Sequence, residues 1–411
     1  MSGCGCDAVQ PGLMPVANAL EQLLDHAVAV TETVEVSLHD ALGRVLAEDQ
    51  LSLVDVPPRD NSAMDGYAIN VGGLAEGQRL TVSQRIPAGT APLPLEEGTA
   101  ARIFTGSEIP EGANAVVMQE NTTAGEDGDV AWVEINQLPE LNGNIREQGQ
   151  DVVSGQCVMP AGTRLQAAHL GVLASVGIAR VRVYRPLKVA VLATGDELVM
   201  PGNELKPGQI YNSNLFTLQG LLRGMGFEIV DLGIVEDTLQ GTVDALARAA
   251  EQADCIISTG GVSVGEEDHV KPAVEALGEL NLWRMAIKPG KPMAYGNVKG
   301  VPFIGLPGNP AAVLVTFTIL ARPYLLKMQG ASVLLPNIFK VKAGFTRTKK
   351  IGRQEYLRAE LDNGMAVLGR SQSSGVLSSA VAAAGYLVVP PQTEVNEGDE
   401  LEFVPFGEVI N

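Results

Sequence analysis

A glycine-rich segment, Ser258–Asp268, contains the residue types that most directly suggest chemistry. Its three glycines, Gly260, Gly261 and Gly265, and its Ser263 follow an apolar run and precede a predicted helix. Glycines let backbone N–H groups approach an anion, and the amino terminus of a helix adds positive potential. An ordinary turn between a strand and a helix has the same pattern. The segment alone therefore leaves an anion site and a structural turn open.

Two further turns follow predicted strands. The first is Lys288-Pro289-Gly290-Lys291-Pro292, with Arg284 nearby in the sequence. Its lysines can bind a phosphate as point charges, although an isolated turn of this kind is usually solvated surface. The second is Leu306-Pro307-Gly308-Asn309-Pro310, which places Pro310 in the first turn of a predicted helix. Backbone N–H groups at that turn suit a ligand, but the turn can also be structural only.

Carboxylates stand at the ends of successive predicted strands. Glu197 follows the first strand of the series, Asp237 follows a neighbouring strand, and Asp268 ends the glycine-rich segment. Oxygen ligands of this kind suit Mg²⁺ beside phosphate. Each residue alone is more typical of a helix cap or a surface acid. Their shared position at strand ends nevertheless favours a metal site near the anion site.

The elements that must position these groups are predicted by the spacing of apolar residues. Leu187–Ala193 is a continuous apolar run, which is typical of a strand buried on both faces. Strands, among them one at Trp283–Ile287, then alternate with helices as far as a helix at Pro310–Lys327. The alternation predicts an α/β fold with a parallel sheet, in which ligands bind beyond the carboxyl ends of the strands. The glycine-rich, lysine and acidic motifs all fall at those ends.

The chain has 411 residues, enough for two to four domains at roughly 150 residues each. Changes in pattern along the sequence divide it into four predicted domains. These are a mixed α/β linking domain (15–55 with 141–180, whose N-terminal helix is free to pack on the central domain), an inserted small β domain (56–140), the α/β domain (181–328) and a C-terminal β domain (329–411).

Composition excludes several classes of protein. A net charge of −19 disfavours nucleic-acid binding, which needs a basic face. We expect no membrane span, because no apolar run reaches about 18 residues, and the first 15 residues do not resemble a secretion signal. The expected location is therefore the cytoplasm. Neither a dinucleotide fingerprint nor a P-loop occurs at the predicted strand ends. The four cysteines match neither a zinc pattern nor a disulfide framework, and a role for Cys4 and Cys6 is left open.

Taken together, these segments closely resemble the MoeA family, the bacterial relatives of gephyrin and the plant Cnx E domains. The matching blocks occur in family order over about residues 55 to 315: PPRDNSAMDGYA, FTGSEIPEGANAVVMQE, NIREQGQD, LATGDEL, GQIYNSN, STGGVSVGEEDHVK, AIKPGKP and GLPGNPAAV. The resemblance implies a molybdopterin molybdenumtransferase. Such an enzyme would take adenylylated molybdopterin and molybdate, and with Mg²⁺ would release AMP and molybdenum cofactor. It also implies an elongated homodimer whose α/β domain binds molybdopterin.

The resemblance further implies roles for individual residues. The implied catalytic residues are Asp65, Asp151, Glu197, Asp237 and Asp268, and all of these except Asp151 would also bind the metal. The implied ligand-binding residues are Thr105, Arg146, Gly260, Gly261, Ser263, Gly265, Arg284, Lys288, Lys291, Pro307, Gly308, Asn309, Pro310, Ser373 and Ser374. The cleft would lie between the α/β domain of one subunit and the DNSAMDGYA-containing part of the other.

Three positions depart from the family pattern. Arg284 stands where many members have lysine, His269 where an aromatic residue is common, and Glu236 where a basic or small residue is frequent. None of them removes an acid of the family, so we expect an active enzyme. Its implied partners are a MogA-like molybdopterin adenylyltransferase and the acceptor molybdoenzyme machinery. Two alternatives are a scaffold that holds molybdopterin without turnover and a nicotinamide oxidoreductase. The preference for molybdate over tungstate is left open.

Overall fold

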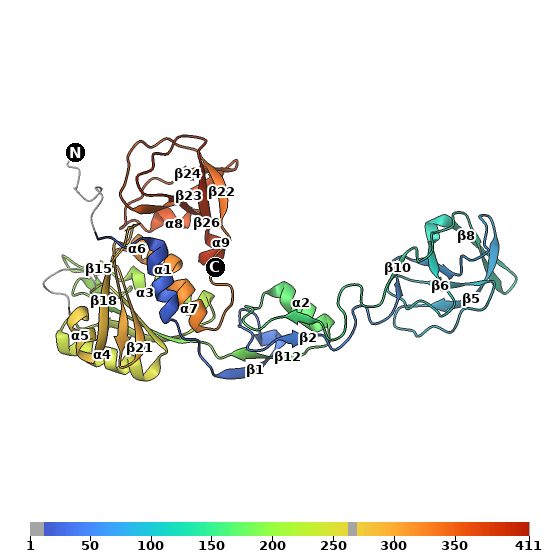
Figure 1. Ribbon diagram of the computed structural model, residues 1–411, viewed down its shortest axis with the longest axis horizontal. Helices are drawn as coiled ribbons and strands as arrows, with labels where there is room; N and C mark the ends of the chain where they lie inside the picture. Colours follow the sequence, from blue (N-terminus) through green and yellow to red (C-terminus); the bar gives the residue numbers. More distant parts are fainter. Residues whose placement is uncertain (1–11, 262–268, 411) are drawn as a thin grey trace.

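The protein is elongated in the computed structural model, which describes residues 12–261 and 269–410. An α/β unit and a C-terminal β-barrel lie together at one end, and an arm leads from them to a separate β lobe at the other (Figure 1). The expectation of an elongated α/β chain with additional β units is confirmed. The predicted roles of Ser263, Gly265 and Asp268 fall outside the described residues, as do Cys4 and Cys6.

The central sheet has six strands. Their order is β16 (Glu228–Val235), β13 (Lys188–Thr194), β17 (Cys255–Thr259), β21 (Val301–Leu306), β20 (Pro292–Val298) and β18 (Gly278–Arg284). The first four pair in parallel, and β20 pairs antiparallel with both β21 and β18. The parallel core was predicted, but β20 was not. The strand expected at Trp283–Ile287 instead ends at Arg284. β20 and β21 form a hairpin whose turn residues, Lys299 and Gly300, both have positive φ.

Helices cover both faces of this sheet. Helices α4 (Leu239–Gln252) and α5 (Val270–Leu277) pack on one face, where Leu246 and Val274 are buried. The other face is covered by α1 (Val16–His26), α3 (Ser213–Gly224), α6 (Pro310–Thr316) and α7 (Arg322–Met328). A π-helical segment, Phe317–Ala321, joins α6 to α7, so the helix predicted from Pro310 runs on to Met328. Among the described residues this helix alone is long and apolar enough to cross a membrane, but 83% of its apolar window is buried inside the protein.

A linking unit and an arm connect this body to the distal lobe. In the linking unit, β1 (Thr33–Ser37) pairs with β12 (Arg180–Tyr184), and β2 (Gln50–Leu51) pairs with β11 (Cys157–Met159). These pairs lie beside a short 3₁₀ turn, Leu38–Asp40, and helix α2 (Ala167–Ser175). In the arm, β3 (Asn61–Ser62) pairs with β10 (Ile145–Arg146). The chain therefore passes through the linking unit twice, once on the way to the lobe and once on the way back.

The distal lobe is one curved sheet with apolar clusters on both faces. Its strand order is β7 (Ala115–Met118), β4 (Gly66–Ile69), β6 (Thr99–Ile103), β5 (Arg79–Ile86), β9 (Val130–Ile135) and β8 (Thr122–Asp127), with a 3₁₀ turn at Gln119–Asn121. Strand β4 is buried along its whole length because it lies between β6 and β7. The residue just before it, Asp65, is thereby fixed at a strand end.

The C-terminal unit is a small closed barrel. Strand β25 pairs with both β23 and β26, which closes the ring formed by β22 (Phe339–Ala343), β23 (Gln354–Asp362), β24 (Met365–Leu368), β25 (Gly385–Val389) and β26 (Glu400–Pro405). Two short helices, α8 (Ser378–Val381) and α9 (Phe406–Val409), flank it. A further strand, β19 (Ile287–Lys288), belongs by sequence to the α/β unit but pairs with β23. The barrel is therefore joined to the α/β unit by backbone hydrogen bonds.

A charged cluster holds the entry to the first parallel strand. The guanidinium of Arg185 donates to both carboxylate oxygens of Asp254, each at 2.7 Å, and also contacts Glu32. The backbone N–H of Lys188 donates to Asp254 at 2.8 Å. Burial acts to raise the pKa of Asp254, but these hydrogen bonds outweigh it and hold the pKa below the ordinary value. The cluster fixes the linking unit to the sheet.

We expect the Asp254→Asn substitution to lower the free energy of unfolding at neutral pH by about 1–3 kcal/mol, because it removes a charged partner of Arg185. A lowered pKa means that this stabilisation is present above the ordinary aspartate pKa of about 3.9 and is lost below it. Urea unfolding followed by circular dichroism should therefore show the two proteins converging below about pH 4. Glu35→Gln, in an exposed pair with Arg180, is the matched control and should cost less than about 1 kcal/mol. Equal losses in both variants would contradict a special role for the cluster.

Candidate functional site

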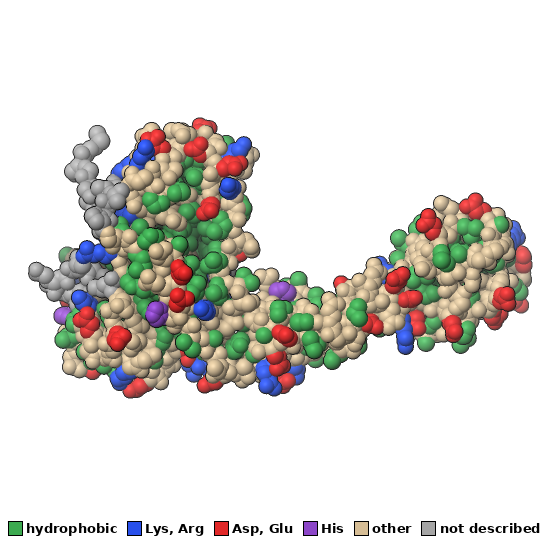
Figure 2. Space-filling model, viewed as in Figure 1, with side chains coloured by type: hydrophobic (Ala, Val, Ile, Leu, Met, Phe, Trp, Pro, Cys, Tyr) green, Lys and Arg blue, Asp and Glu red, His purple; other side chains and the backbone are tan. Residues whose placement is uncertain are grey.

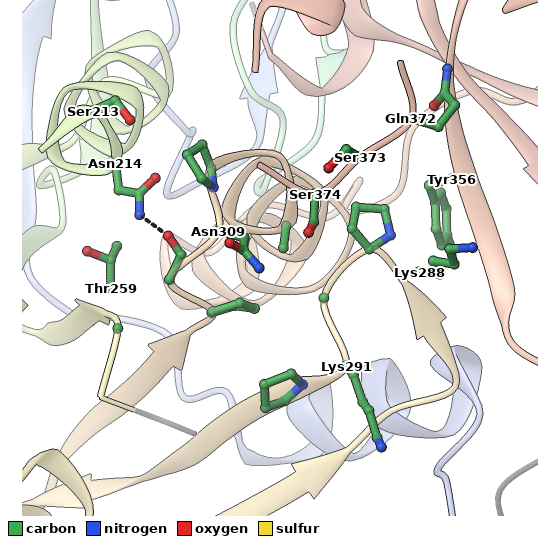
Figure 3. Close-up of a pocket in the computed structure, with 18 of the residues that line it drawn as sticks. Ser213, Asn214, Thr259, Lys288, Lys291, Asn309, Tyr356, Gln372, Ser373 and Ser374 are labelled. Atoms are coloured by element: carbon green, nitrogen blue, oxygen red, sulfur yellow. Dashed lines mark hydrogen bonds between the residues drawn. The ribbon is translucent and has the colours of Figure 1, made fainter. Parts of the chain in front are cut away.

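A cavity of about 900 Å³ opens at the carboxyl ends of the parallel strands, between the sheet and the barrel. The segments that follow β13, β17 and β21 form one side of it, and the barrel contributes the other. Figure 3 shows Asn214 and Thr259 on one side, Lys288 and Tyr356 on the opposite side, and Asn309 and Ser374 between them. The cavity thus lies where a parallel sheet is expected to bind its ligand.

Glycines allow the turns at the base of the cavity to lie close together. Gly261 has a φ of +65°, and a Cβ on it would lie 2.2 Å from Val270 Cγ2. Gly260 has a φ of +84°, and a Cβ on the neighbouring Gly308 would lie 3.8 Å from Gly260 Cα. A side chain on Gly261 would therefore collide with helix α5, whereas the turns that follow β17 and β21 already lie within van der Waals reach of each other. This contact joins two of the motifs identified in the sequence.

The carboxylate of Glu197 folds back over Gly195. A Cβ on Gly195, whose φ is +140°, would lie 2.4 Å from Glu197 Oε2. The backbone carbonyl of Glu197 accepts from the N–H of Ile210 at 2.7 Å, which fixes the base of the side chain. Glu197 is one of two carboxylates that line the cavity in the described part of the chain. It places an acid at the end of the first parallel strand, as the sequence indicated.

The turn Lys288-Pro289-Gly290-Lys291-Pro292, which we call the lysine corner, forms the cationic wall of the cavity together with the barrel. Lys288 lies on β19 opposite Glu355 of β23, and the Lys288 Nζ lies 3.4 Å from Glu355 Oε1. The guanidinium of Arg347 contacts the other oxygen of Glu355, and Arg353 Nη1 donates to the carbonyl of Ile287 at 3.3 Å. The Glu355 side chain is buried, with only 2% of the residue exposed. This buried carboxylate therefore holds two cations at the junction of the two units.

The charge of the cavity is opposite to that of the chain. Its described lining has four cations, Lys288, Lys291, Arg347 and Arg353, against the two carboxylates of Glu197 and Glu355. The whole chain carries −19. A local excess of positive charge at the ends of parallel strands suits a phosphate or another small oxyanion.

The neutral side of the cavity is built from the start of helix α3 and the turns near it. The Asn212 side chain caps α3 by accepting from the N–H of Leu215 at 3.2 Å, and Asn214 Nδ2 donates to the carbonyl of Gly308 at 2.7 Å (Figure 3). From the barrel side, the carbonyl of Ser374 accepts from the N–H of Ala311 at 2.9 Å. These bonds fix the start of α3, the turn after β21 and the barrel loop relative to one another.

Many of the residues selected from the sequence line this one cavity. They come from segments far apart in the chain: Glu197, Gly260, Gly261, Lys288, Lys291, Pro307, Gly308, Asn309, Pro310, Ser373 and Ser374. Their shared location is an observation of the structure. Their individual roles in binding and catalysis remain predictions.

Other selected residues do not line the cavity formed by the described residues of one chain. Asp237 follows β16 at one edge of the sheet, and Arg284 ends the antiparallel strand β18 at the other edge. Asp65 and Thr105 belong to the distal lobe, while Arg146 and Asp151 lie in and beside the arm. The linking unit lies between the α/β unit, which holds the cavity, and the arm and lobe, which hold these last four residues (Figure 1).

Asp65 nevertheless sits in a defined local site. Its Oδ1 accepts from both the backbone N–H and the hydroxyl of Thr105, each at 2.8 Å. These two hydrogen bonds hold the pKa of Asp65 below its ordinary value, and nearby Arg102 acts in the same direction. Arg146 pairs with Asn61 in the adjoining strands of the arm. Since Asp65 is exposed, its carboxylate is an ionised, oriented group facing solvent.

The described residues of one chain supply only part of the expected magnesium site. Among the described residues, no group of three or more His, Cys, Asp or Glu side chains is placed to hold a metal ion. Glu355 is already engaged by Arg347 and Lys288, which leaves Glu197 as the other carboxylate that lines the cavity among the described residues. A complete magnesium site is therefore not formed by the described residues alone, and the expected ligand Asp268 lies outside them.

Several residues of the lining were missed in the sequence. Asn212, Ser213 and Asn214 lie in the GQIYNSN block but were not singled out, and Arg347, Arg353 and Glu355 of the barrel were not considered. A signal for the barrel residues was present, because the segment from Arg347 to Arg353 has four cations among seven residues of an acidic chain. Its proximity to the lysine corner follows from the β19–β23 pairing, which the sequence does not reveal.

The fold and the site define a multidomain α/β protein whose cationic cavity suits an anionic small molecule. Three family models match successive parts of the chain: the MoeA N-terminal region (domain I and II) over residues 14–177, a probable molybdopterin binding domain over 190–327, and the MoeA C-terminal region (domain IV) over 340–406. The chain belongs to the MoeA family, which confirms the resemblance seen in the sequence.

Relatives match most of the chain. The molybdopterin molybdenumtransferase of Haemophilus influenzae is 42% identical over 351 residues, covering 84% of this chain and 85% of the relative. The protein of the same name from Nostoc sp. is 35% identical over 408 residues, covering 95% and 93%. The crystal structure of the molybdopterin biosynthesis MoeA protein from Pyrococcus horikoshii OT3 matches with a TM-score of 0.82 at 31% identity, covering 96% and 100%.

We expect the Glu355→Gln substitution to lower the free energy of unfolding by about 1–3 kcal/mol, because Arg347 and Lys288 lose their shared buried carboxylate. Thermal unfolding would measure this loss, and added inorganic phosphate should recover part of it by supplying an anion to the two cations. Glu360→Gln on the exposed end of the same strand is the matched control. A similar loss in both variants, or no response to phosphate in Glu355→Gln, would refute the proposed pairing of cations in the cavity.

Proposed function

We propose that this protein is a molybdopterin molybdenumtransferase that inserts molybdate into adenylylated molybdopterin with release of AMP, giving molybdenum cofactor. The observation that carries the proposal is the cationic cavity at the ends of β13, β17 and β21 in a chain whose overall charge is −19. The negatively charged phosphates of a phosphoric anhydride would be attracted by the cations that line this cavity. The relatives from Haemophilus influenzae and Nostoc sp., both named molybdopterin molybdenumtransferase, support the same activity.

The cations of the cavity bind and orient the substrate. Cleavage of a phosphoric anhydride by water moves negative charge onto the departing AMP, so positive groups that already face the phosphates stabilise the transition state. Lys288 and Lys291 act as point charges on the sheet side, and Arg347 and Arg353 act from the barrel. Molybdate, an oxyanion, would occupy either the lysine corner or a position beside Arg146.

Magnesium is part of this proposal only as an expectation from the family. The described residues of one chain offer Glu197 in the cavity and no acidic group of three residues that could hold a metal ion. An ion bound there would help neutralise the phosphates. A second chain that brings an aspartate to the cavity would complete a more favourable ligand set.

A homodimer accounts for the separation of Asp65 from the cavity. The carboxylate of Asp65 is exposed, ionised and oriented by Thr105, yet it lies on a lobe that the arm holds away from the cavity of its own chain (Figure 1). In a two-fold dimer, the lobe of one copy would reach the cavity of the other. A cytoplasmic adenylyltransferase resembling MogA would supply the substrate, and acceptor molybdoenzymes would consume the product.

A direct assay tests the proposed activity. Purified protein with adenylylated molybdopterin, molybdate and Mg²⁺ should release AMP, measured by chromatography. Asp65→Asn should keep substrate affinity within about threefold and lower the rate by at least about a hundredfold, since the group is removed without altering the cavity wall. Substrate binding without AMP release by the unaltered protein would identify a scaffold instead of an enzyme.

A mixing experiment tests whether the site is shared between two copies. Asp65→Asn and Lys288→Ala proteins are each expected to be nearly inactive. Co-expression at equal levels should restore about a quarter of the normal activity, because half of the dimers are mixed and each holds one intact site. Asp65→Asn co-expressed with a second variant of the lobe, Thr105→Val, is the control and should restore nothing. Recovery in the control, or its absence in the test, would exclude a shared site.

A further inference from the structure

The neutral side of the cavity contains two amide groups with unused hydrogen-bonding atoms. Within the described part of the chain, Asn212 Nδ2 and Asn214 Oδ1 are buried and have no hydrogen-bond partner. Both residues line the cavity, and Asn212 is only 2% exposed. A buried donor and a buried acceptor without partners cost free energy unless a ligand or water satisfies them. They stand two residues apart, at the start of helix α3.

Backbone partners fix the orientation of both amides. Asn212 Oδ1 must be an oxygen because it accepts from the N–H of Leu215, so the atom left over is a donor. Asn214 Nδ2 must be a nitrogen because it donates to the carbonyl of Gly308, so the atom left over is an acceptor. Neither side chain can rotate by half a turn without losing its backbone bond. The pair therefore presents one donor and one acceptor of fixed identity.

Apolar and aromatic surface lies beside this pair. Strand β14 (Leu198–Val199) pairs with β15 (Ile210–Tyr211), and Leu198, Ile210 and Tyr211 also line the cavity. The Tyr211 hydroxyl donates to the carbonyl of Asn203 at 2.9 Å, which holds the ring in place. Ile210 and Tyr211 are 55% and 45% exposed. Exposed apolar surface next to a polar pair is typical of a site that receives a flat ring.

We propose that Asn212 and Asn214 recognise the edge of a flat nitrogen heterocycle, with Asn212 donating to a ring or carbonyl acceptor and Asn214 accepting from a neighbouring N–H. This inference rests on the proposed function, whose substrate contains two such heterocycles, a pterin and an adenine. Each of them presents an acceptor next to an N–H donor. The pair therefore determines specificity for the ring, while the opposite wall binds the phosphates.

A phosphate does not fit this side of the cavity as well. An anionic oxygen would meet the Asn214 Oδ1 acceptor, and two acceptors repel each other. The lysines and arginines that favour a phosphate come from the lysine corner and the barrel. Figure 3 shows Lys288 and Lys291 on the opposite side of the cavity from Asn214. The cavity is thus divided into a neutral end for a ring and a cationic end for an oxyanion.

The Asn212→Asp substitution tests the inference, because aspartate caps a helix as well as asparagine does but replaces the free donor with an acceptor. Binding to the full-length protein would be measured by calorimetry with three probes: 6-hydroxymethylpterin, adenosine and ribose 5-phosphate. We expect affinity for one of the two ring probes to fall by about tenfold to a hundredfold, with ribose 5-phosphate changed by less than about threefold. The ring probe that responds identifies the heterocycle.

Other outcomes would overturn the inference. An equal loss of affinity for all three probes would mean that the added charge acts on the whole cavity. Unchanged affinity for both ring probes would mean that Asn212 and Asn214 do not bind a ring. Asn212→Ser, which keeps a helix cap and a hydroxyl donor, should retain more ring affinity than Asn212→Asp. The result is separable from the proposed function. Loss of AMP release in the unaltered protein would overturn the proposed function alone, whereas the ring probes report on the pair.

Discussion

One buried carboxylate organises the polar side of the junction between the α/β unit and the barrel, where the cavity opens. Glu355 faces Lys288 across the β19–β23 pair and also binds Arg347, so the backbone and the side chains fasten the same two segments. Burying a single charge is costly unless it is paired. Here the pairing places two cations at the cavity wall and holds the barrel over the ends of the parallel strands. The apolar core that barrel residues such as Tyr386 and Phe406 share with the helices of the α/β unit holds the same two units together.

The sequence was informative where chemistry follows directly from local structure. The apolar run that became β13 and the turns containing Gly260, Lys288 and Pro310 were placed correctly, because motifs at the ends of parallel strands meet at one edge. Contacts between distant segments were not predictable in this way. The hairpin of β20 and β21 and the approach of Arg347 to the lysine corner are set by pairing partners, which local periodicity does not specify. The family resemblance directed attention to Asp65, but its position relative to the cavity of a second chain remains a prediction.

The acidic surface and the cationic cavity have opposite effects on an anionic ligand. Most of the acidic residues are exposed or half-buried, whereas the cations that matter for a ligand gather on one wall of the cavity. Figure 2 shows acidic side chains spread over both ends of the visible face, with no single large basic surface. The acidic surface repels an anionic ligand at long range, and the cationic wall of the cavity attracts it at short range. The attraction dominates inside the cavity because solvent screens it less there.

The double passage of the chain through the linking unit has a consequence for how the protein is made. The distal lobe is continuous in sequence, from Gly66 to Ile135, so its strands can pair as soon as they have been synthesised. The strand β1 must wait for β12, since Glu35 and its partner Arg180 are separated by 145 positions. Closing so long a loop is slow, and it becomes easier once the lobe between the two strands is compact. The part of the molecule that sets the direction of the arm is thus completed late, after the lobe that it carries has already folded.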